Sequence, residues 1–377
     1  MAKVIILKTD ESQVEHNINQ IFKLAGGIEK FIKPGDKVLL KPNFLNPKKS
    51  STGCTTSPAV IEAVVKAVLK QGAIPIIGES SPVSFDTDLT FKRLGIDKIA
   101  RRHRISLIDL NKYSSRIVKV KEPLRMKRIR VSDMVFEVDK IINLPVMKTH
   151  SLTTISLGMK NLMGCVPGVE KLVLHRVGMH EAIVDLASVI KPTFTIIDAI
   201  IAMEGMGPAN GKARRMNLLI GSDDLLASEI IGARIMGANP YQLKYIQLSK
   251  GKDIGEYDIE KIEVVGANLS DVKRKFSLPS SKASGVFSSL VLGTIPLAIA
   301  RSGIDISRPA QKLYDFMRSY PEFIDTCKRC RRCVLNCPEK ALTLNHHPKP
   351  LLDKKKCIKC YVCDEVCIYN SVRVKRK

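Results

Sequence analysis

The 377-residue sequence contains no tryptophan, and its phenylalanine and tyrosine residues bring the aromatic content to only 5%. Proteins that hold single-stranded nucleic acid stack its bases on aromatic side chains placed among basic ones. A net charge of +24 supplies the basic residues here, but the aromatic partners are scarce. We therefore expect no nucleic acid partner, although the charge alone keeps a nucleic-acid-modifying enzyme as a distant alternative.

Long apolar runs are also missing. The most apolar stretch, residues 285–300, spans 16 residues and contains Pro296, whereas a membrane-spanning helix needs about 20 apolar residues. The first residues, MAKVIILKTDESQ, predict a β-strand and not a signal peptide. We expect a cytoplasmic protein without a membrane span.

Cysteine, in contrast, is concentrated near the C-terminus. Eight of the ten cysteines lie in two runs, CKRCRRCVLNC from Cys327 and CIKCYVCDEVC from Cys357, and each cysteine of the first run recurs 30 positions later. The flanks repeat as well, because the alternating stretches 341–344 and 371–374 each predict a short strand. Two copies of one ligand loop and one strand are typical of a two-cluster bacterial ferredoxin.

In that arrangement the fourth cysteine of each run binds the cluster of the other run. We therefore assign two [4Fe-4S] clusters, the first to Cys327, Cys330, Cys333 and Cys367, and the second to Cys357, Cys360, Cys363 and Cys337. Ile368 follows Cys367 where the usual motif has proline, a change that removes no ligand. Zinc is the alternative metal, but these runs oversupply a four-ligand zinc site. A disulfide framework would suit a small secreted domain.

The positive charge needs an explanation of its own. Two clusters with their thiolates are anionic, so part of the charge of +24 would neutralise them. The remainder would attract an anionic small molecule or an acidic redox partner, such as a ferredoxin or another electron carrier. A solvated lysine-rich surface is the alternative, and the sequence leaves a homo-oligomer open.

Residues 1–284 alternate between strand-like and helix-like segments. Ser57 and Pro58 begin a predicted helix that Gly72 ends, and Gly237 ends another. This alternation predicts an α/β fold, with a mostly parallel sheet covered by helices on both faces. A helical linker, residues 285–324, would join it to a small α+β ferredoxin-like domain, residues 325–377. The predicted strands lie in KVLLKPNFLN, AIPIIG, KIINLPVMKTH, TFTIIDAI, MNLLIGSDD and KIEVVG.

Ligands of such sheets bind beyond the carboxyl ends of the strands, where polar loops follow several of the predicted strands. Cations, amides and a carboxylate gathered there would suit an anionic organic molecule. The three glycines after TFTIIDAI do not match the dinucleotide-binding pattern G-x-G-x-x-G. We assign catalytic roles to Lys148, His150, Lys160 and Asp198, and cofactor-binding roles to Lys41, Asn43, Asn161, His175 and Glu204.

Several of these assignments have a structural alternative. Lys148 and His150 would be ordinary solvated residues if their loop faced away from the ligand. Asp198 could cap a turn as readily as act as an acid, and the same two alternatives apply to Glu204. The two remaining cysteines, Cys54 and Cys165, are expected to be small buried thiols.

Four long motifs carry a family resemblance. KPNFLNP, TSPAVIEAVVKAVLKQGA, INLPVMKTHSLTTISLGMKNLMGCVPG and IIDAIIAMEGMGPANG occur in the order of the prokaryotic family named domain of unknown function 362, which this chain resembles over residues 37–237. Several members of that family carry a ferredoxin module at one end. The family motif G-x-D-P-V-A-x-D reads GSDDLLASE here, with Asp224 in place of proline and Glu229 in place of the last aspartate. If that aspartate orders a ligand or metal, Glu229 must do so with a longer side chain.

The resemblance implies no activity, so the residues must suggest one. We expect an iron–sulfur oxidoreductase that passes electrons between the two clusters and an anionic substrate or cofactor. Lys148 and Lys160 would hold the anion, and His150 or His175 would deliver protons. A flavin or another organic ligand would collect single electrons from the clusters and pass them on in pairs. Without such a centre, the alternative is a non-catalytic electron-transfer or redox-sensing subunit whose large domain binds a partner.

Overall fold

The computed structural model describes residues 1–82, 85–209, 211–279, 320–335, 337, 339–357, 363, 367, 369 and 371–374. The chain divides into two compact units, the first comprising residues 1–82 and 86–304 and the second containing residues 305–377. The expected domain boundary at residue 284 and most of the expected linker lie outside the described residues, as does Cys360.

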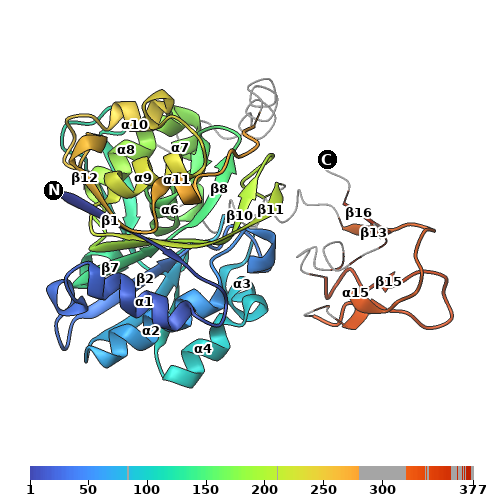
Figure 1. Cartoon of the computed structure of the whole chain (residues 1–377). Helices are drawn as coiled ribbons and strands as arrows, with labels where there is room; N and C mark the ends of the chain where they lie inside the picture. The colour runs from blue at the N-terminus through green and yellow to red at the C-terminus, as the bar shows by residue number, and fades with distance from the viewer. Residues whose placement is uncertain are drawn as a thin grey trace. The chain divides into compact units, whose positions relative to one another are not determined.

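A single sheet organises the first unit, and within the described residues it has ten strands (Figure 1). Across the sheet the order is β12 (Ile262–Gly266), β1 (Ala2–Lys8), β11 (Lys212–Ser222), β10 (Phe194–Glu204), β7 (Lys140–Leu144), β2 (Lys37–Pro42), β3 (Ile74–Glu79) and β4 (Ser106–Asp109). Strand β8 (Val146–His150) pairs with β10 and with β9 (Thr154–Ser156). A separate hairpin joins β5 (Ser115–Lys119) to β6 (Arg128–Ser132).

Most of the strand pairs in this sheet are parallel. The antiparallel ones are the pairs that β11 makes with β1 and β10, and the pair of β8 with β9. The prediction of a mostly parallel sheet is therefore confirmed.

Helices cover both faces of the sheet (Figure 1). Alternate residues of a strand point to opposite faces, and in β2 Leu39 joins one apolar core while Val38 and Leu40 join the other. The core of Val38 contains side chains from α1 (Val14–Leu24), α2 (Pro58–Lys70), α3 (Thr87–Leu94) and α4 (Ile96–His103). The core of Leu39 contains side chains from α5 (Met134–Glu137), α6 (Gly158–Asn161), α7 (Gly168–Val177), α8 (Met179–Val189), α9 (Leu225–Ile235), α10 (Lys244–Leu248) and α11 (Leu269–Val272).

The local signals for helix ends are found where the sequence placed them. Ser57 is the N-cap of α2, Pro58 is its first residue, and Gly72 follows its end with a φ of +77° that favours glycine. Gly237 follows α9 in the same way, with a φ of +75°. Among the described residues, none of the helices combines the length and apolar character needed to cross a membrane.

One expected loop is largely strand. The segment after residue 200 was predicted to be a polar loop, but β10 continues to Glu204 and β11 begins at Lys212, so the two form a long antiparallel hairpin. Their register shifts between Ala199 and Ile201, where one residue of β10 faces two residues of β11, which marks a β-bulge in β11.

The second unit has short paired strands. β13 (Pro321–Phe323) pairs with β16 (Val372–Val374), β14 (Leu342–Thr343) pairs with β15 (Leu351–Leu352), and α15 (Arg332–Leu335) lies in the first cysteine run. The two short strands predicted from the repeated flanks are therefore present as β14 and β16.

Candidate functional site

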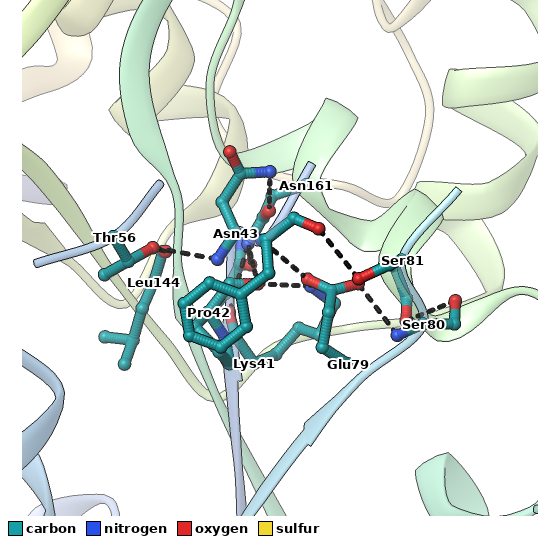
Figure 2. Close-up of polar contacts among 12 residues, drawn as sticks. Lys41, Pro42, Asn43, Thr56, Glu79, Ser80, Ser81, Leu144 and Asn161 are labelled. Atoms are coloured by element: carbon teal, nitrogen blue, oxygen red, sulfur yellow. Dashed lines mark hydrogen bonds and ion pairs between the residues drawn. The ribbon is translucent and has the colours of Figure 1, made fainter. Parts of the chain in front are cut away.

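A buried ion pair lies where β2 and β3 end (Figure 2). The Lys41 side chain is fully buried, and its Nζ donates a hydrogen bond of 2.6 Å to Glu79 Oε2 and another to the Pro42 carbonyl. Glu79 also accepts hydrogen bonds from the Phe44 N–H at 3.2 Å and the Ser80 N–H at 2.9 Å. Both charges are therefore out of water and depend on each other and on backbone groups.

Three asparagine amides connect this pair to β7 and α6. Asn43 Nδ2 donates to Asn161 Oδ1 at 2.9 Å, and Asn161 Nδ2 donates to the Lys41 carbonyl at 3.0 Å and to Asn143 Oδ1 at 2.8 Å. Asn143 Nδ2 in turn donates to the Gly158 carbonyl at 3.0 Å. This chain of amides fixes α6 against the carboxyl ends of the strands.

Lys148 and His150 lie within a strand and not on the loop that the sequence suggested. Both belong to β8, where their exposed fractions are 2% and 6%. Lys148 Nζ donates to Asn43 Oδ1 and, at 3.0 Å, to the Cys54 carbonyl. Burial lowers the pKa of Lys148 to about 8. A buried lysine that donates to neutral oxygens retains its positive field, so it remains a candidate for holding an anion.

His150 serves a local role in the turn between β8 and β9. Its Nδ1 accepts hydrogen bonds from the backbone N–H groups of Leu152 at 3.1 Å and Thr153 at 3.3 Å. An accepting Nδ1 places the proton of a neutral ring on Nε2. The His150 ring therefore helps to form the tight turn.

Two further lysines approach the same region from α6 and α7. Lys160 is half-buried, and its Nζ lies 3.1 Å from the Met163 sulfur, with no carboxylate of the described residues paired to it. Lys171 is 8% exposed and donates to Ser80 through the carbonyl and, at 2.7 Å, the hydroxyl. We call Lys41, Lys148, Lys160 and Lys171 the lysine cluster.

The lysines of this cluster perturb one another. Burial, with added repulsion from Lys148 and Lys171, lowers the pKa of Lys160 to about 7. Burial lowers the pKa of Lys171 to about 8, although Glu79 acts in the opposite direction. Lys41 likewise acts to lower the pKa of both Lys148 and Lys171, so the cluster brings together amines whose positive charges repel one another.

Glu229 supports the helix that carries Lys160. It is fully buried, its Oε1 accepts a hydrogen bond of 2.6 Å from the Met159 N–H, and its Oε2 accepts one of 2.6 Å from the Tyr245 hydroxyl. Burial raises the pKa of Glu229 to about 7. The glutamate at the variant motif position thus binds the amino-terminal backbone of α6, which gives the longer side chain a structural task.

Asp198 and Glu204 make their contacts elsewhere. Asp198 lies inside β10, where it accepts hydrogen bonds from the N–H groups of Ser57 at 2.8 Å and Ile200 at 3.1 Å, and burial raises its pKa to about 6. Its carboxylate therefore fixes the backbone of β10 at Ile200 and the start of α2.

Glu204 ends β10. Its Oε2 lies 2.5 Å from Arg214 and accepts a hydrogen bond of 3.1 Å from the Ser277 N–H. Burial alone would raise the pKa of Glu204, but these two partners outweigh it and leave the pKa below its usual value. Among the contacts of the described residues, neither Glu204 nor Asp198 pairs with the lysine cluster.

The remaining assignments have mixed outcomes. His175 belongs to α7, but its side chain lies outside the described residues. Cys54 and Cys165 are buried thiols as expected, and burial raises the pKa of Cys165 to about 12. The sequence reasoning missed Glu79 and Asn143 as parts of the site. Their signal was a polar residue at the end of, or inside, an otherwise apolar strand.

Cysteines of the two runs share a cavity and make equivalent backbone contacts in the second unit. Cys327, Cys330, Cys333 and Cys367, the set assigned to the first cluster, all line one small cavity. The Ala341 N–H donates to Cys337 Sγ at 3.2 Å, and the Ser371 N–H donates to Cys367 Sγ at 3.2 Å, so the two halves of the repeat make the same bond. Across the described residues, no three His, Cys, Asp or Glu side chains are grouped closely enough to hold a single metal ion.

Two curated proteins are similar to this chain. One is the thylakoid-associated protein sll1697 of Synechocystis sp., which is 31% identical over 232 residues, 59% of this chain and 70% of that protein. The other is the dihydromethanopterin reductase (acceptor) of Methanosarcina mazei, which is 24% identical over 133 residues, 34% of this chain and 53% of that protein.

Two solved structures show a distant likeness. The lactate racemase apoprotein from Thermoanaerobacterium thermosaccharolyticum superposes with a TM-score of 0.38 and 10% identity, over 60% of this chain and 55% of that one. A protein from Thermotoga maritima superposes with a TM-score of 0.36 and 14% identity, over 57% of this chain and 56% of that one. The chain thus spans little more than half the length of either structure.

The motifs quoted from the sequence agree with a family match. The model of the family described as domain of unknown function (DUF362) matches residues 38–234, which contain the lysine cluster, α6 and Glu229. This match covers more than half of the chain, and we conclude that the protein belongs to the DUF362 family.

Proposed function

We propose that this protein is an iron–sulfur oxidoreductase whose α/β unit binds an anionic small molecule at the lysine cluster. The observation that carries the proposal is the charge imbalance of that cluster. Lys41 is paired with the Glu79 carboxylate, whereas the acceptors that the described residues offer to Lys148 and Lys160 are neutral oxygen and sulfur atoms. Buried cations are costly unless they are paired. An anionic ligand would supply the missing negative charge.

The proposal assigns two [4Fe-4S] clusters to the second unit. In a cubane cluster each thiolate binds a different iron, so four sulfurs around a cavity suit it better than ligands converging on one ion. Backbone N–H groups that donate to Cys337 and Cys367 are of the kind that tune cluster potentials. When bound, the clusters would supply single electrons. The name of the Methanosarcina mazei relative, a reductase, agrees with redox chemistry.

The iron content tests the redox half of the proposal. Anaerobically reconstituted protein should hold about eight irons and eight sulfides. Cys330→Ala and Cys360→Ala should each damage one cluster and so lower the iron content, measured together with the visible absorption of the clusters. Cys165→Ala is the matched control, because this buried thiol with a pKa of about 12 lies outside the repeat. One or two zinc ions and no brown colour would rule out the assignment.

Sulfate binding tests the anion site, because sulfate keeps its charge from pH 6.5 to 9.5. The lowered lysine pKa values mean that the cluster loses protons as the pH rises through about 7 and 8. Sulfate affinity, measured by calorimetry, should therefore fall steadily over this range. Ordinary exposed lysines, with pKa values of about 10.4, would leave the affinity nearly constant up to about pH 9.

Lys160→Met should weaken sulfate binding about tenfold to a hundredfold at pH 6.5, since a charge-assisted hydrogen bond contributes about 1.5–3 kcal/mol. At pH 9 the effect should be small, because Lys160 is already neutral in the parent protein. Lys23→Met, at an exposed position of α1, is the control. The variant should have the same melting temperature as the parent protein, since the acceptor that the described residues offer to the Lys160 amine is a thioether. Equal affinity in the two variants at pH 6.5 would contradict the proposal.

A further inference from the structure

Lys160 differs from the other members of the lysine cluster in two respects. Lys41, Lys148 and Lys171 are 0%, 2% and 8% exposed and donate to carboxylate, carbonyl, amide or hydroxyl oxygens. Lys160 is half-buried, and its recorded contact is the sulfur of Met163. A thioether is a weak acceptor, so it holds the amine in place without consuming its lone pair or its charge.

The amine is also held on a supported element. Glu229 bonds to the backbone of Met159, and Asn161 bonds to β2 and β7, so the residues on both sides of Lys160 are anchored. Lys148 has two described acceptors, Asn43 and the Cys54 carbonyl, and an ammonium has three N–H donors. One N–H of Lys148 is therefore left for a ligand near the Lys160 amine.

We propose that Lys160 is a nucleophilic amine that forms an iminium with the carbonyl carbon of an anionic aldehyde or ketone, a class that includes 2-oxo acids and phosphorylated aldehydes. This inference rests on the anion site proposed above and names the substrate class of that site. The charged group of the substrate contacts Lys148, while the field of Lys171 adds to the attraction. The carbonyl carbon is then directed to Lys160.

The chemistry balances without an oxidant or reductant. The lone pair of the Lys160 amine attacks the carbonyl carbon. The carbonyl oxygen takes up one proton from the nitrogen and one from solvent and leaves as water, and a protonated carbon–nitrogen double bond, the iminium, remains. Lysines next to other cations are activated for this reaction because the neutral amine is favoured. The pKa of Lys160, lowered to about 7 by burial and by its two lysine neighbours, leaves a large share of the amine unprotonated at neutral pH.

Reductive trapping tests the inference on the full-length protein. Glyoxylate is the anionic probe, propionaldehyde is the neutral one, and cyanoborohydride reduces any iminium to a stable secondary amine that peptide mass spectrometry locates. At pH 7 glyoxylate should label Lys160 at least about tenfold faster than an exposed lysine such as Lys23, since a lower pKa gives more free amine. Propionaldehyde, which lacks the anionic group, should favour Lys160 over Lys23 less strongly than glyoxylate does, and glycolate, which has no aldehyde or ketone group, should slow the labelling by glyoxylate.

Two variants of Lys160, with a Lys23 variant as the control, distinguish iminium formation from anion binding. Lys160→Arg keeps the charge but cannot form the iminium, so the fast adduct should disappear while sulfate still binds. Lys160→Met should also lose the adduct, whereas Lys23→Arg should keep it. Labelling that follows exposure alone, with Lys160 no faster than Lys23, would overturn the inference. If sulfate binding still showed its fall with pH, the anion site would stand without the iminium; if sulfate did not bind, both would fail.

Discussion

Glu79→Gln should lower the free energy of unfolding by about 3–5 kcal/mol, because it leaves the buried Lys41 ammonium without its counter-charge. The side chains of the pair are 0% and 3% exposed, and Nζ lies 2.6 Å from the carboxylate. The Phe44 and Ser80 N–H groups donate to different oxygens of Glu79, and glutamine keeps only one oxygen, so the substitution removes the charge and one of these backbone hydrogen bonds. Urea or guanidinium denaturation measures the difference.

The chain offers a matched control for this result. Glu15 pairs with Lys66 at the same 2.6 Å, but their side chains are 54% and 44% exposed. Glu15→Gln should cost less than about 1 kcal/mol, as exposed ion pairs do. The double variant Lys41→Met with Glu79→Gln should recover much of the lost stability, because no uncompensated charge remains. Equal losses at Glu79 and Glu15 would show that burial does not set the energy of the pair.

Gly164→Ala should lower the free energy of unfolding by about 3 kcal/mol or more, because it combines overpacking with damage to the same ion pair. An ideal Cβ at Gly164 would overlap the Glu79 carboxylate and both the Cε and the Nζ of Lys41. The Gly164 carbonyl also accepts hydrogen bonds from Ser80, so the backbone cannot easily withdraw. Differential scanning calorimetry should show a lower melting temperature and a weaker response to sulfate.

Gly35→Ala is the control that separates a loss of stability through overpacking from one through backbone strain. A Cβ at Gly35 would meet no atom within 4 Å, but the residue has a φ of +86°. Its substitution should cost about 1–2 kcal/mol, the strain of a left-handed backbone at a non-glycine residue. A loss at Gly164 no greater than that at Gly35 would mean that the ion pair can move aside.

The strands and helices of the large unit could be predicted because their signals are local. Strands such as β2 are buried on both faces and appear as continuous apolar runs, while Pro58 and Gly72 mark the two ends of α2. The extent of β10 could not be predicted in this way. Its pairing with β11 as far as Glu204 is set by register across the hairpin and not by local polarity.

The sequence predicted part of the membership of the site but not its geometry. Lys41, Asn43, Lys148, Lys160 and Asn161 do meet at the carboxyl ends of the strands. Lys148 was placed on a loop because a lysine after an apolar run usually marks the end of a strand. Its actual partners, Asn43 and the Cys54 carbonyl, lie far away in the sequence, so no local pattern could reveal that a lysine can be buried there.

The wide spacing of the cluster along the chain has a consequence for its dynamics. Lys41, Glu79, Lys148 and Lys171 come from separate elements, so their charges meet only after the central strands have assembled. Long-range contacts of this kind form slowly and open only through large-scale unfolding. A ligand that neutralises the cluster would therefore slow amide hydrogen exchange throughout β2, β3 and β7, and not merely in nearby loops. Ligand binding at this one site would thus stabilise the central strands of the sheet against opening.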